Sequence, residues 1–348
     1  MHQSQPVEQK PTIPLEVRIL KSLYKIQKVY YPFLAVAGIY FNVVAILILS
    51  RGKCGLSKCI TRYLLAMASS DLLVVILDLI LRQLPVLFYI SFVTSIKACN
   101  IHAILLYAAT DCSVWFTVTF TFDRFVVISC PKLKSKYCNE KIAAVVIGTV
   151  SVLSCLKNVI WYFLYTSQYR LFNDPWFCIV KTNVRYSLVW RIIELAHYVS
   201  TPCIPFVLVL LFNVLTVKKI FAASIARQRL RLQQSREKEN DPEMQNRKKS
   251  IVLMFVISGN FIAFWALFLT YSVYYQSIWL TNGSVGQHYI VRELGFMLQL
   301  LNCCTNTFIY AITQSKFRAQ LKDMVKCPLI AFVRLFVKFG LYLEKLII

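Results

Sequence analysis

The sequence predicts an all-helical membrane protein, a bundle of seven transmembrane helices followed by a short amphipathic helix. Of its 348 residues, 57% are hydrophobic and only 16% are charged, whereas soluble domains carry about 25% charged residues. A helix needs about 20 apolar residues to cross a bilayer, and seven segments reach that length. They cover residues 29–50, 61–88, 98–130, 141–165, 187–221, 250–276 and 289–313.

The seven segments differ in composition. The second, fifth and seventh contain polar residues in mid-span, so hydropathy alone marks them less sharply than the other four. Prolines lie inside three segments: Pro32 in the first, Pro85 in the second, and Pro202 and Pro205 in the fifth. In a membrane helix a proline kinks the backbone without the cost that it has in water. Pro131 is expected to end the third helix.

The net charge of +23 is concentrated between the apolar segments. Lys and Arg gather after the first, third and fifth segments and in the C-terminal tail, whereas residues 277–288 contain no Lys, Arg, Asp or Glu. Basic links face the cytoplasm, so residues 1–28 are predicted to be an extracellular tail, 29–314 the membrane domain and 315–348 a cytoplasmic tail. This distribution indicates a multi-pass plasma-membrane protein and argues against nucleic-acid binding.

An ion pair, Asp123-Arg124, lies inside the apolar run of the third segment. Arg124 lies 25 residues (124 − 99) after Cys99, which is about 37 Å of helix. Since a bilayer with its headgroups is about 40–45 Å thick, Asp123-Arg124 is expected at the cytoplasmic mouth when Cys99 lies at the outer surface. The simpler alternative is an interfacial ion pair without a special role.

The twelve cysteines show no metal-ligand spacing, and most are expected to be buried free thiols. Cys178 is the one cysteine of the second outer link. Because the outside of a cell is oxidising, a disulfide between Cys99 and Cys178 is predicted, with two free thiols as the alternative.

Asp71 lies in the middle of the second segment, in "LLAMASSDLLVV". A charge at that depth is costly and usually functional. Polar residues of other segments are expected to converge on it, and their oxygen atoms would suit a small cation such as sodium; these are Asn42, Ser113, Asn302 and Asn306. The alternative is a protonated, neutral aspartic acid in a hydrogen-bonded core.

Residues 29–326 resemble a class A (rhodopsin-like) G-protein-coupled receptor. The landmarks occur in order along the chain: Asn42, Asp71 in "LAMASSD", Cys99, "DRF", Pro205, "FIAFW", "NTFIY" and "SKFR". Each motif alone is weakly specific, but their combined order and spacing are specific. "SKFR" resembles the start of the short helix that follows the seventh span in that family.

The sequence departs from the family pattern at several landmarks. Phe125 replaces the tyrosine of the DRY motif, Thr307 replaces the proline of NPxxY, and Leu267 stands where the sixth helix usually has a proline. No acidic residue opens the sixth helix near Arg247, so no ion-pair lock between that helix and Arg124 is expected. These changes bear on how stable the resting state is.

The resemblance implies a receptor that binds a small extracellular ligand and activates a heterotrimeric G protein. It implies that Asp123, Arg124 and Tyr310 meet the G protein, and that Phe261 and Trp265 form the switch between the pocket and the core. Arrestin and membrane lipid are the further partners that it implies. Apart from sodium as an allosteric ion, no cofactor and no metal are expected.

The family's ligand site lies between the outer halves of helices 3, 5, 6 and 7. Leu106 stands where amine receptors place an aspartate, and Leu300 where opsins place the retinal lysine, so neither ligand is expected. Trp161 lies too near the outer end to be the family's mid-helix tryptophan. The pocket residues implied are Leu106, Tyr107, Thr110, Glu194, His197, Tyr198, Phe268, Tyr271 and Phe296.

Within class A, the helix 3 stretch "LLYAATDCSVWFTVTFTFDRF" and "NTFIY" most resemble the probable G-protein-coupled receptor 139-like orphan group. That resemblance implies an aromatic amino acid or a short peptide as ligand, and thus neuropeptide-like signalling. Charges of both signs near the outer rim would suit a zwitterion, unless they pair among themselves.

Two modification sites are predicted. Asn282 starts the glycosylation sequon Asn282-Gly283-Ser284 in the third outer link, and Cys327 is a candidate for palmitoylation. A transporter or channel is the alternative function, but the repeats and broken helices typical of transporters are not visible. No nucleophile and base occur in a recognisable motif, so the chain is not expected to be an enzyme.

Overall fold

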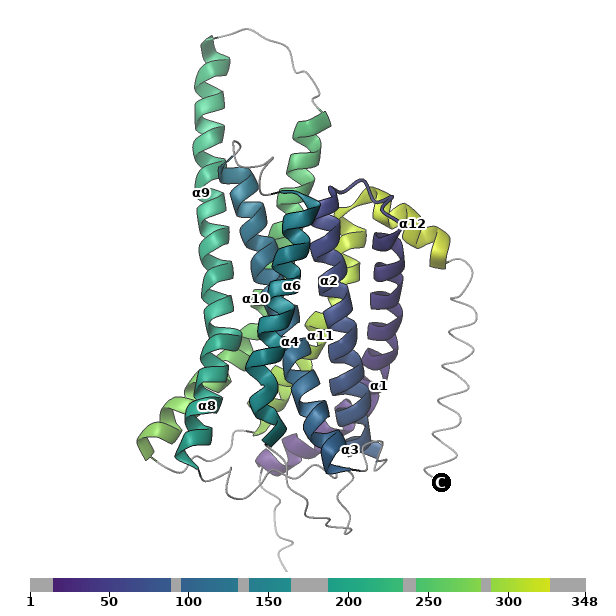
Figure 1. Cartoon of the computed structure of the whole chain (residues 1–348), viewed down its shortest axis with the longest axis vertical. Coiled ribbons are helices and arrows are strands. Elements are labelled where there is room, and N and C mark those ends of the chain that lie inside the picture. Colours follow the sequence, from purple (N-terminus) through teal and green to yellow (C-terminus); the bar gives the residue numbers. More distant parts are fainter. Residues whose placement is uncertain are drawn as a thin grey trace, which may run out of the picture.

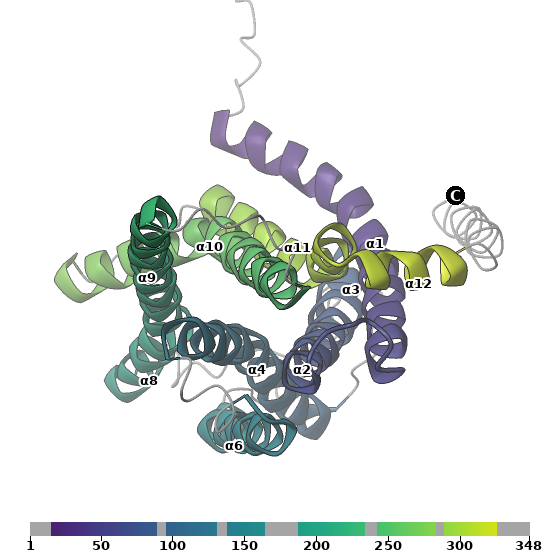
Figure 2. The same cartoon turned by 90° about the horizontal axis from the view of Figure 1, so that it is seen from above.

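The computed structural model describes residues 15–88, 95–130, 138–163, 187–233, 242–282 and 289–325. Within these residues every regular element is a helix and none is a strand. The helices run side by side in one bundle (Figure 1), and the view along the bundle shows them arranged in a ring (Figure 2). The all-helical prediction is confirmed for this part of the chain.

The first half of the bundle contains four long helical segments. Two of them change helix type along their length, through a π-helical stretch (η1) and a 3-10 turn (η3). The elements are α1 (Leu15–Ser50), α2 (Lys58–Val74), η1 (Val75–Gln83), α3 (Leu84–Phe88), α4 (Ile96–Ser129), α6 (Glu140–Asn158) and η3 (Val159–Phe163).

The second half contains a segment broken near Pro202, two long helices and a short one. Thr201 has non-helical dihedral angles there, as the residue before a proline prefers. The elements are α8 (Leu188–Tyr198), η4 (Val199–Cys203), α9 (Ile204–Gln233), α10 (Pro242–Asn282), α11 (Tyr289–Thr313) and α12 (Ser315–Val325).

Six helical segments of the described chain are long and apolar enough to cross a membrane. The seventh predicted span, α11, forms with its predicted bounds but is not among the six. Its middle carries Gln299, Asn302 and Asn306, and these amides lower its mean hydropathy. Each of the three is buried inside the bundle, where polar groups of a membrane helix belong.

The first helix begins earlier than predicted. Residues 15–28, predicted as part of a tail, are the first turns of α1. This stretch has no proline or glycine, so nothing in it opposes a helix. It runs past the edge of the bundle (Figure 2), where the Tyr24 hydroxyl donates to the Leu87 carbonyl oxygen at 3.4 Å and Gln27 Nε2 donates to Glu293 Oε2 at 3.0 Å.

Two other boundaries also differ from the prediction. The fifth segment ends at Gln233 rather than at residue 221, and α10 covers Pro242–Asn282 rather than 250–276. Hydropathy delimits only the apolar part of a helix. Residues with high helix propensity can extend the same helix beyond that part. Both helices therefore project beyond the others at one end of the bundle (Figure 1). Asn282, predicted in a link, is the last residue of α10.

The centre of the bundle is α4, which packs against α2, α6, α9 and α10. The bundle also depends on a close approach of α10 and α11, where a Cβ on Gly295 would lie 3.1 Å from the backbone of Phe268. The short helix α12 begins where "SKFR" predicts it. Its Phe317 is fully buried, edge-on against the ring of Tyr310 at 5.7 Å.

Candidate functional site

A cavity of about 90 Å³ lies between η1, α4, η3, α8, η4, α10 and α11. Eight of the nine pocket residues named from the resemblance line it. The ninth, Tyr271, does not, and its ring stacks on Tyr275 at 5.8 Å. The full lining among the described residues is Asp78, Arg82, Leu106, Tyr107, Thr110, Trp161, Glu194, His197, Tyr198, Thr201, Trp265, Phe268, Phe296 and Gln299.

Trp161 is a lining residue that the sequence did not indicate. Its ring stacks on Tyr107 with centroids 4.4 Å apart and meets His197 edge-on at 5.3 Å. Its Nε1 donates to Asn158 Oδ1 at 2.9 Å, which fixes the ring. The position near the outer end of the fourth segment, noted above as a departure from the family pattern, is what brings Trp161 to the cavity.

Several polar groups of the cavity have no partner. The Nε1 of Trp265, the Nδ1 of His197 and the Oε1 of Gln299 are buried without a hydrogen bond among the described residues. Glu194 also lines the cavity but is exposed rather than buried, and no described residue forms an ion pair with its carboxylate. Because buried polar groups are nearly always hydrogen-bonded, this cavity is suited to a polar occupant that supplies the missing partners.

Other charges at this end of the bundle pair with one another. This is the alternative to a zwitterion site that the sequence left open for the charges near the outer rim. Arg82 lies 3.4 Å from Asp78, and Arg292 lies 2.9 Å from Glu293. Asp78 is buried inside the cavity rather than at the rim.

An ion pair between a buried carboxylate and a partly exposed lysine lies near the cavity and was missed by the sequence reasoning. Asp111 of α4 is buried and lies 2.7 Å from Lys157 Nζ of α6. The lysine also donates to Ser200 Oγ and Thr201 Oγ1, at 3.0 and 3.2 Å. The pair thus joins α4, α6 and η4. Asp111 in "AATDCS" is a mid-span charge like Asp71, and the same rule would have found it.

Aromatic rings connect the cavity to the middle of the bundle. The centroid of Phe296 lies 5.1 Å from that of Phe268, which lies 6.0 Å from Trp265. Trp265 lies 5.6 Å from Phe261, and Phe261 lies 6.5 Å from Phe206 of α9. The two residues named as a switch, Phe261 and Trp265, are therefore the inner part of one continuous row.

Asp71 is fully buried in the middle of the bundle. Ser113 Oγ donates to its Oδ1 at 2.5 Å, and Asn306 Nδ2 donates to its Oδ2 at 2.6 Å. No Lys or Arg pairs with it in the part of the chain that is described. Of the four residues expected to converge on Asp71, Ser113 and Asn306 thus contact its carboxylate.

The remaining polar residues expected near Asp71 form other contacts. Asn302 Oδ1 accepts from Asn260 Nδ2 of α10 at 2.8 Å. Asn42 donates to the carbonyl oxygens of Gly38 and Cys303, both at 2.9 Å. Each amide is thus hydrogen-bonded away from the carboxylate, because a neighbouring helix offers a partner on another side.

Arg124 is buried at the far end of α4 from the cavity. It forms an ion pair with Asp123, with Nε 3.0 Å from Oδ2. Its Nη1 donates to Ser250 Oγ of α10 at 3.2 Å, and its Nη2 donates to Cys138 Sγ at 3.3 Å. Arg124 therefore contacts α10 through a neutral hydroxyl where the sequence predicted no ion-pair lock.

The thiol of Cys138, in the link before α6, has an unusual environment for a cysteine. A hydrogen bond from Cys59 and the positive charge of Arg124 lower the pKa of this thiol. Tyr310, also expected to meet a G protein, is fully buried, and its hydroxyl has no partner among the residues described.

Three predicted modification sites lie partly or wholly outside the described residues. Cys99 is in a disulfide, but Cys178 lies outside the described residues, so the pairing with Cys178 stays a prediction. The Asn282 side chain and Cys327 also lie outside the described parts of the structure.

A comparison with protein-family models gives a match over residues 41–310. The matched family is described as "7 transmembrane receptor (rhodopsin family)". The match starts within α1 and ends at Tyr310 of α11, so it includes the cavity, Asp71 and Arg124.

Proposed function

The chain belongs to the rhodopsin family of seven-transmembrane receptors, and from this premise we propose that it binds a small extracellular ligand and activates a heterotrimeric G protein. It is a multi-pass membrane protein of a signalling-receptor family, and that family is not an enzymatic one. A transporter or channel is not favoured. In the proposed orientation the N-terminus is outside the plasma membrane and Arg124 faces the cytoplasm, as the basic links indicate.

The observation that carries this proposal is the cavity with its unpaired polar groups. Helix α8 supplies the acceptor Glu194 and a ring nitrogen of His197, and α10 supplies the ring nitrogen of Trp265. A ligand that reaches these groups also touches Trp265, the residue from which the aromatic row runs toward the core.

These groups fit a small zwitterion with an aromatic side chain, an amino acid or a short peptide. The ligand ammonium would pair with the Glu194 carboxylate, and its carboxylate would accept from Trp265 Nε1 and from His197. The aromatic ring would pack among Tyr107, Trp161 and Phe268. The resemblance to the probable G-protein-coupled receptor 139-like orphan group supports the same ligand class.

Activation is proposed to be a shift between two states of the bundle. The ligand would favour the state in which the end of α10 that carries Ser250 moves away from α4. It would do so because its contact with Trp265 differs between the two states. That motion breaks the contact between Arg124 and Ser250 and frees Arg124 for the G protein. Arrestin and anionic lipid are proposed as further partners of the same end, through its basic links.

Sodium is proposed as an allosteric ion of the resting state. A buried carboxylate without a basic partner is stabilised by a cation, and Asp71 meets that condition in this structure. Asp71, Ser113 and Asn306 would hold the ion, with Asn302 joining them once its side chain leaves Asn260. The ion would supply the positive charge that the described residues around Asp71 lack.

The test is expression of the full chain with an extracellular tag in cultured cells. Calcium and cyclic-AMP responses are recorded for a panel of aromatic amino acids and short peptides. Arg124→Ala is expected to remove every response at equal surface expression. Glu194→Gln is expected to weaken agonist potency about tenfold or more, since a hydrogen bond to a charged group contributes about 1.5–3 kcal/mol.

The matched control is Glu293→Gln, the same change at the same end of the bundle. Glu293 does not line the cavity and is paired with Arg292, so its variant should keep wild-type potency. A response that survives Arg124→Ala would contradict G-protein coupling. Equal effects of the two glutamine variants would contradict the ligand position.

A further inference from the structure

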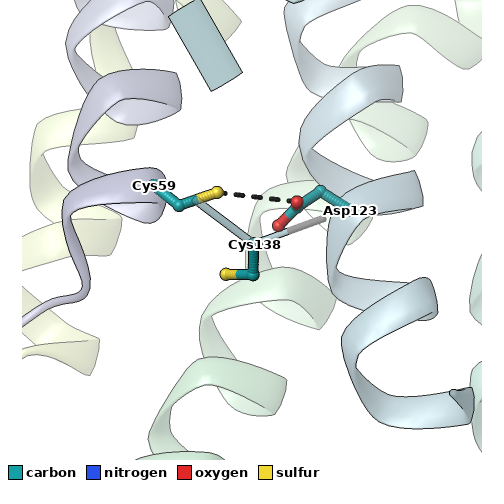
Figure 3. Close-up of side chains that lie close together, drawn as sticks. All are labelled: Cys59, Asp123 and Cys138. Atoms are coloured by element: carbon teal, nitrogen blue, oxygen red, sulfur yellow. Dashed lines mark hydrogen bonds between the residues drawn. The ribbon is translucent and has the colours of Figure 1, made fainter. Parts of the chain in front are cut away.

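Three metal-ligating side chains meet at the Arg124 end of the bundle, away from the cavity. Cys59 lies in the first turn of α2, Asp123 near the end of α4, and Cys138 just before α6. Figure 3 shows the three side chains converging from these separate elements. One ligand atom from each lies within 4.8 Å of the other two. The spacing of the cysteines in the sequence gives no sign of this cluster, because folding alone brings positions 59, 123 and 138 together.

The separation of the ligand atoms fits a tetrahedral ion. Cys59 Sγ lies 3.5 Å from Asp123 Oδ1. In a tetrahedral zinc site, Zn–S distances of about 2.3 Å and Zn–O distances of about 2.0 Å place sulfur and oxygen ligands about 3.5 Å apart. Cys59 and Asp123 are 1% and 8% exposed, so both ligands are held in place by packing.

The two oxygens of Asp123 have different neighbours. Oδ2 accepts from Arg124, whereas Oδ1 faces Cys59. Arg124 therefore orients the carboxylate and leaves Oδ1 for an ion, as outer hydrogen bonds do around metal ligands. Its Nη2 also donates to the Cys138 sulfur at 3.3 Å.

The charges of the cluster also balance. Two thiolates and one carboxylate around Zn²⁺ sum to −1, and the guanidinium of Arg124 brings the total to zero. A buried site that is neutral overall avoids the cost of a buried net charge. Thiolates select zinc over magnesium or calcium, which prefer oxygen ligands.

We propose that Cys59, Asp123 and Cys138 bind Zn²⁺, with a water molecule as the fourth ligand. Binding displaces one proton from each thiol, so the reaction is Zn²⁺ plus two thiols giving the bound ion and two H⁺, with no change of oxidation state. The ion fastens the first turn of α2 and the link before α6 to α4. It also holds Asp123 in the position that pairs with Arg124.

The test uses the purified full chain in detergent and Co²⁺ as a spectroscopic substitute for zinc. The wild type is expected to develop the thiolate-to-cobalt charge-transfer absorption, saturating at one ion per chain, and Zn²⁺ is expected to remove it. Cys59→Ser and Cys138→Ser should each lose this absorption, and Asp123→Asn should weaken cobalt binding. The matched control is Cys54→Ser, because Cys54 is a buried free thiol of the preceding link that lies outside the cluster; this variant should bind cobalt like the wild type.

A second measurement separates metal binding from misfolding. Zn²⁺ should raise the Tm of the wild type and of Cys54→Ser but not of Cys59→Ser or Cys138→Ser, with all four chains monodisperse and helical by circular dichroism. The proposal is wrong if the folded wild type shows no cobalt–thiolate band, or if the band survives both cluster substitutions. It is also wrong if Cys59 and Cys138 are found joined as a disulfide. None of these readouts needs a ligand or a G protein, so their failure leaves the proposed function standing.

Discussion

The cavity and the surroundings of Arg124 differ in how their buried polar groups are paired. At the cavity end, Trp265, His197 and Gln299 have buried polar atoms without partners among the described residues. At the other end, Arg124 is equally buried, yet its guanidinium bonds to Asp123, Ser250 and Cys138. The cavity therefore lacks partners for several of its polar atoms, whereas the guanidinium of Arg124 is fully engaged by neighbouring side chains.

This difference indicates that ligand binding can lower the free energy at the cavity, whereas exposing Arg124 raises it. A molecule that completes the hydrogen bonds of the cavity gains binding energy there. Exposure of Arg124 costs energy because its internal contacts must break. Under the proposed mechanism, the active state becomes populated when the binding energy gained at the cavity exceeds the cost of breaking the Arg124 contacts.

The largest effect is expected at the Asp111–Lys157 ion pair near the cavity. Lys157→Met leaves the Asp111 carboxylate buried without its cation, and such a loss costs about 3 kcal/mol. Thermal unfolding of the purified chain should show a large fall in Tm, whereas Lys219→Met on the exposed face of α9 should not. The double variant with Asp111→Asn should recover most of the loss. If Lys157→Met unfolds like the wild type, the pair does not stabilise this end.

Asp71 lies between the two ends and tests the sodium proposal. Sodium at ten times its Kd is expected to stabilise the wild type by about 1.4 kcal/mol, seen as a rise in Tm when NaCl replaces N-methylglucamine chloride at constant ionic strength. Asp71→Asn should unfold at the same temperature in both salts. A sodium-dependent Tm that persists in Asp71→Asn would place the ion elsewhere.

The closure of the Arg124 end depends partly on Ser250. Ser250→Ala removes one hydrogen bond to a buried, charged guanidinium, worth about 1.5 kcal/mol, so ligand-free signalling should rise about tenfold. Basal cyclic-AMP or calcium output at matched surface expression measures this. Thr270→Ala, on the exposed face of the same helix, is the control and should leave the basal output unchanged. Unchanged output in Ser250→Ala would mean that this contact does not restrain α10.

The smallest effect is expected on the solvent side of the same end. Arg62 and Lys58 both contact Glu140, at 2.6 and 3.6 Å, on exposed side chains. Because water and salt screen such pairs, Glu140→Gln should give no resolvable change in Tm at physiological salt. A clear fall in the Tm of Glu140→Gln would show that these exposed ion pairs contribute to stability despite screening.

Apolar runs predicted the membrane helices well, and the family match confirms the resemblance to class A receptors. The run at 98–130 is α4 (Ile96–Ser129), and that at 289–313 is α11. The extension of α1 back to Leu15 was missed, because helix outside the membrane does not depend on an apolar run. Likewise α9 and α10 continue through polar residues that hydropathy reads as links.

The site was predictable where one mid-span charge pointed to it. Asp71 drew attention to Ser113 and Asn306, which do bond to it. Asp111 is also a charged residue in mid-span, but only its neighbour Thr110 was predicted as a site residue. No sequence rule would place Trp161 against Tyr107, or Cys138 beside Cys59, because these contacts depend on how separate helices pack.

Because α10 is one uninterrupted helix, a small tilt at one point moves its distant end by a larger distance. Its 41 residues contain no proline after the first position, so it is a rod about 60 Å long, while its neighbour is broken at Thr201. Ser250 lies 15 residues (265 − 250) from Trp265, about 22 Å along the axis, so a tilt of only about 5° about the tryptophan moves the serine by about 2 Å. That displacement is enough to part it from Arg124, now 3.2 Å away. A ring rotation too slight to remodel the cavity can in this way be amplified into a broken contact at the far end.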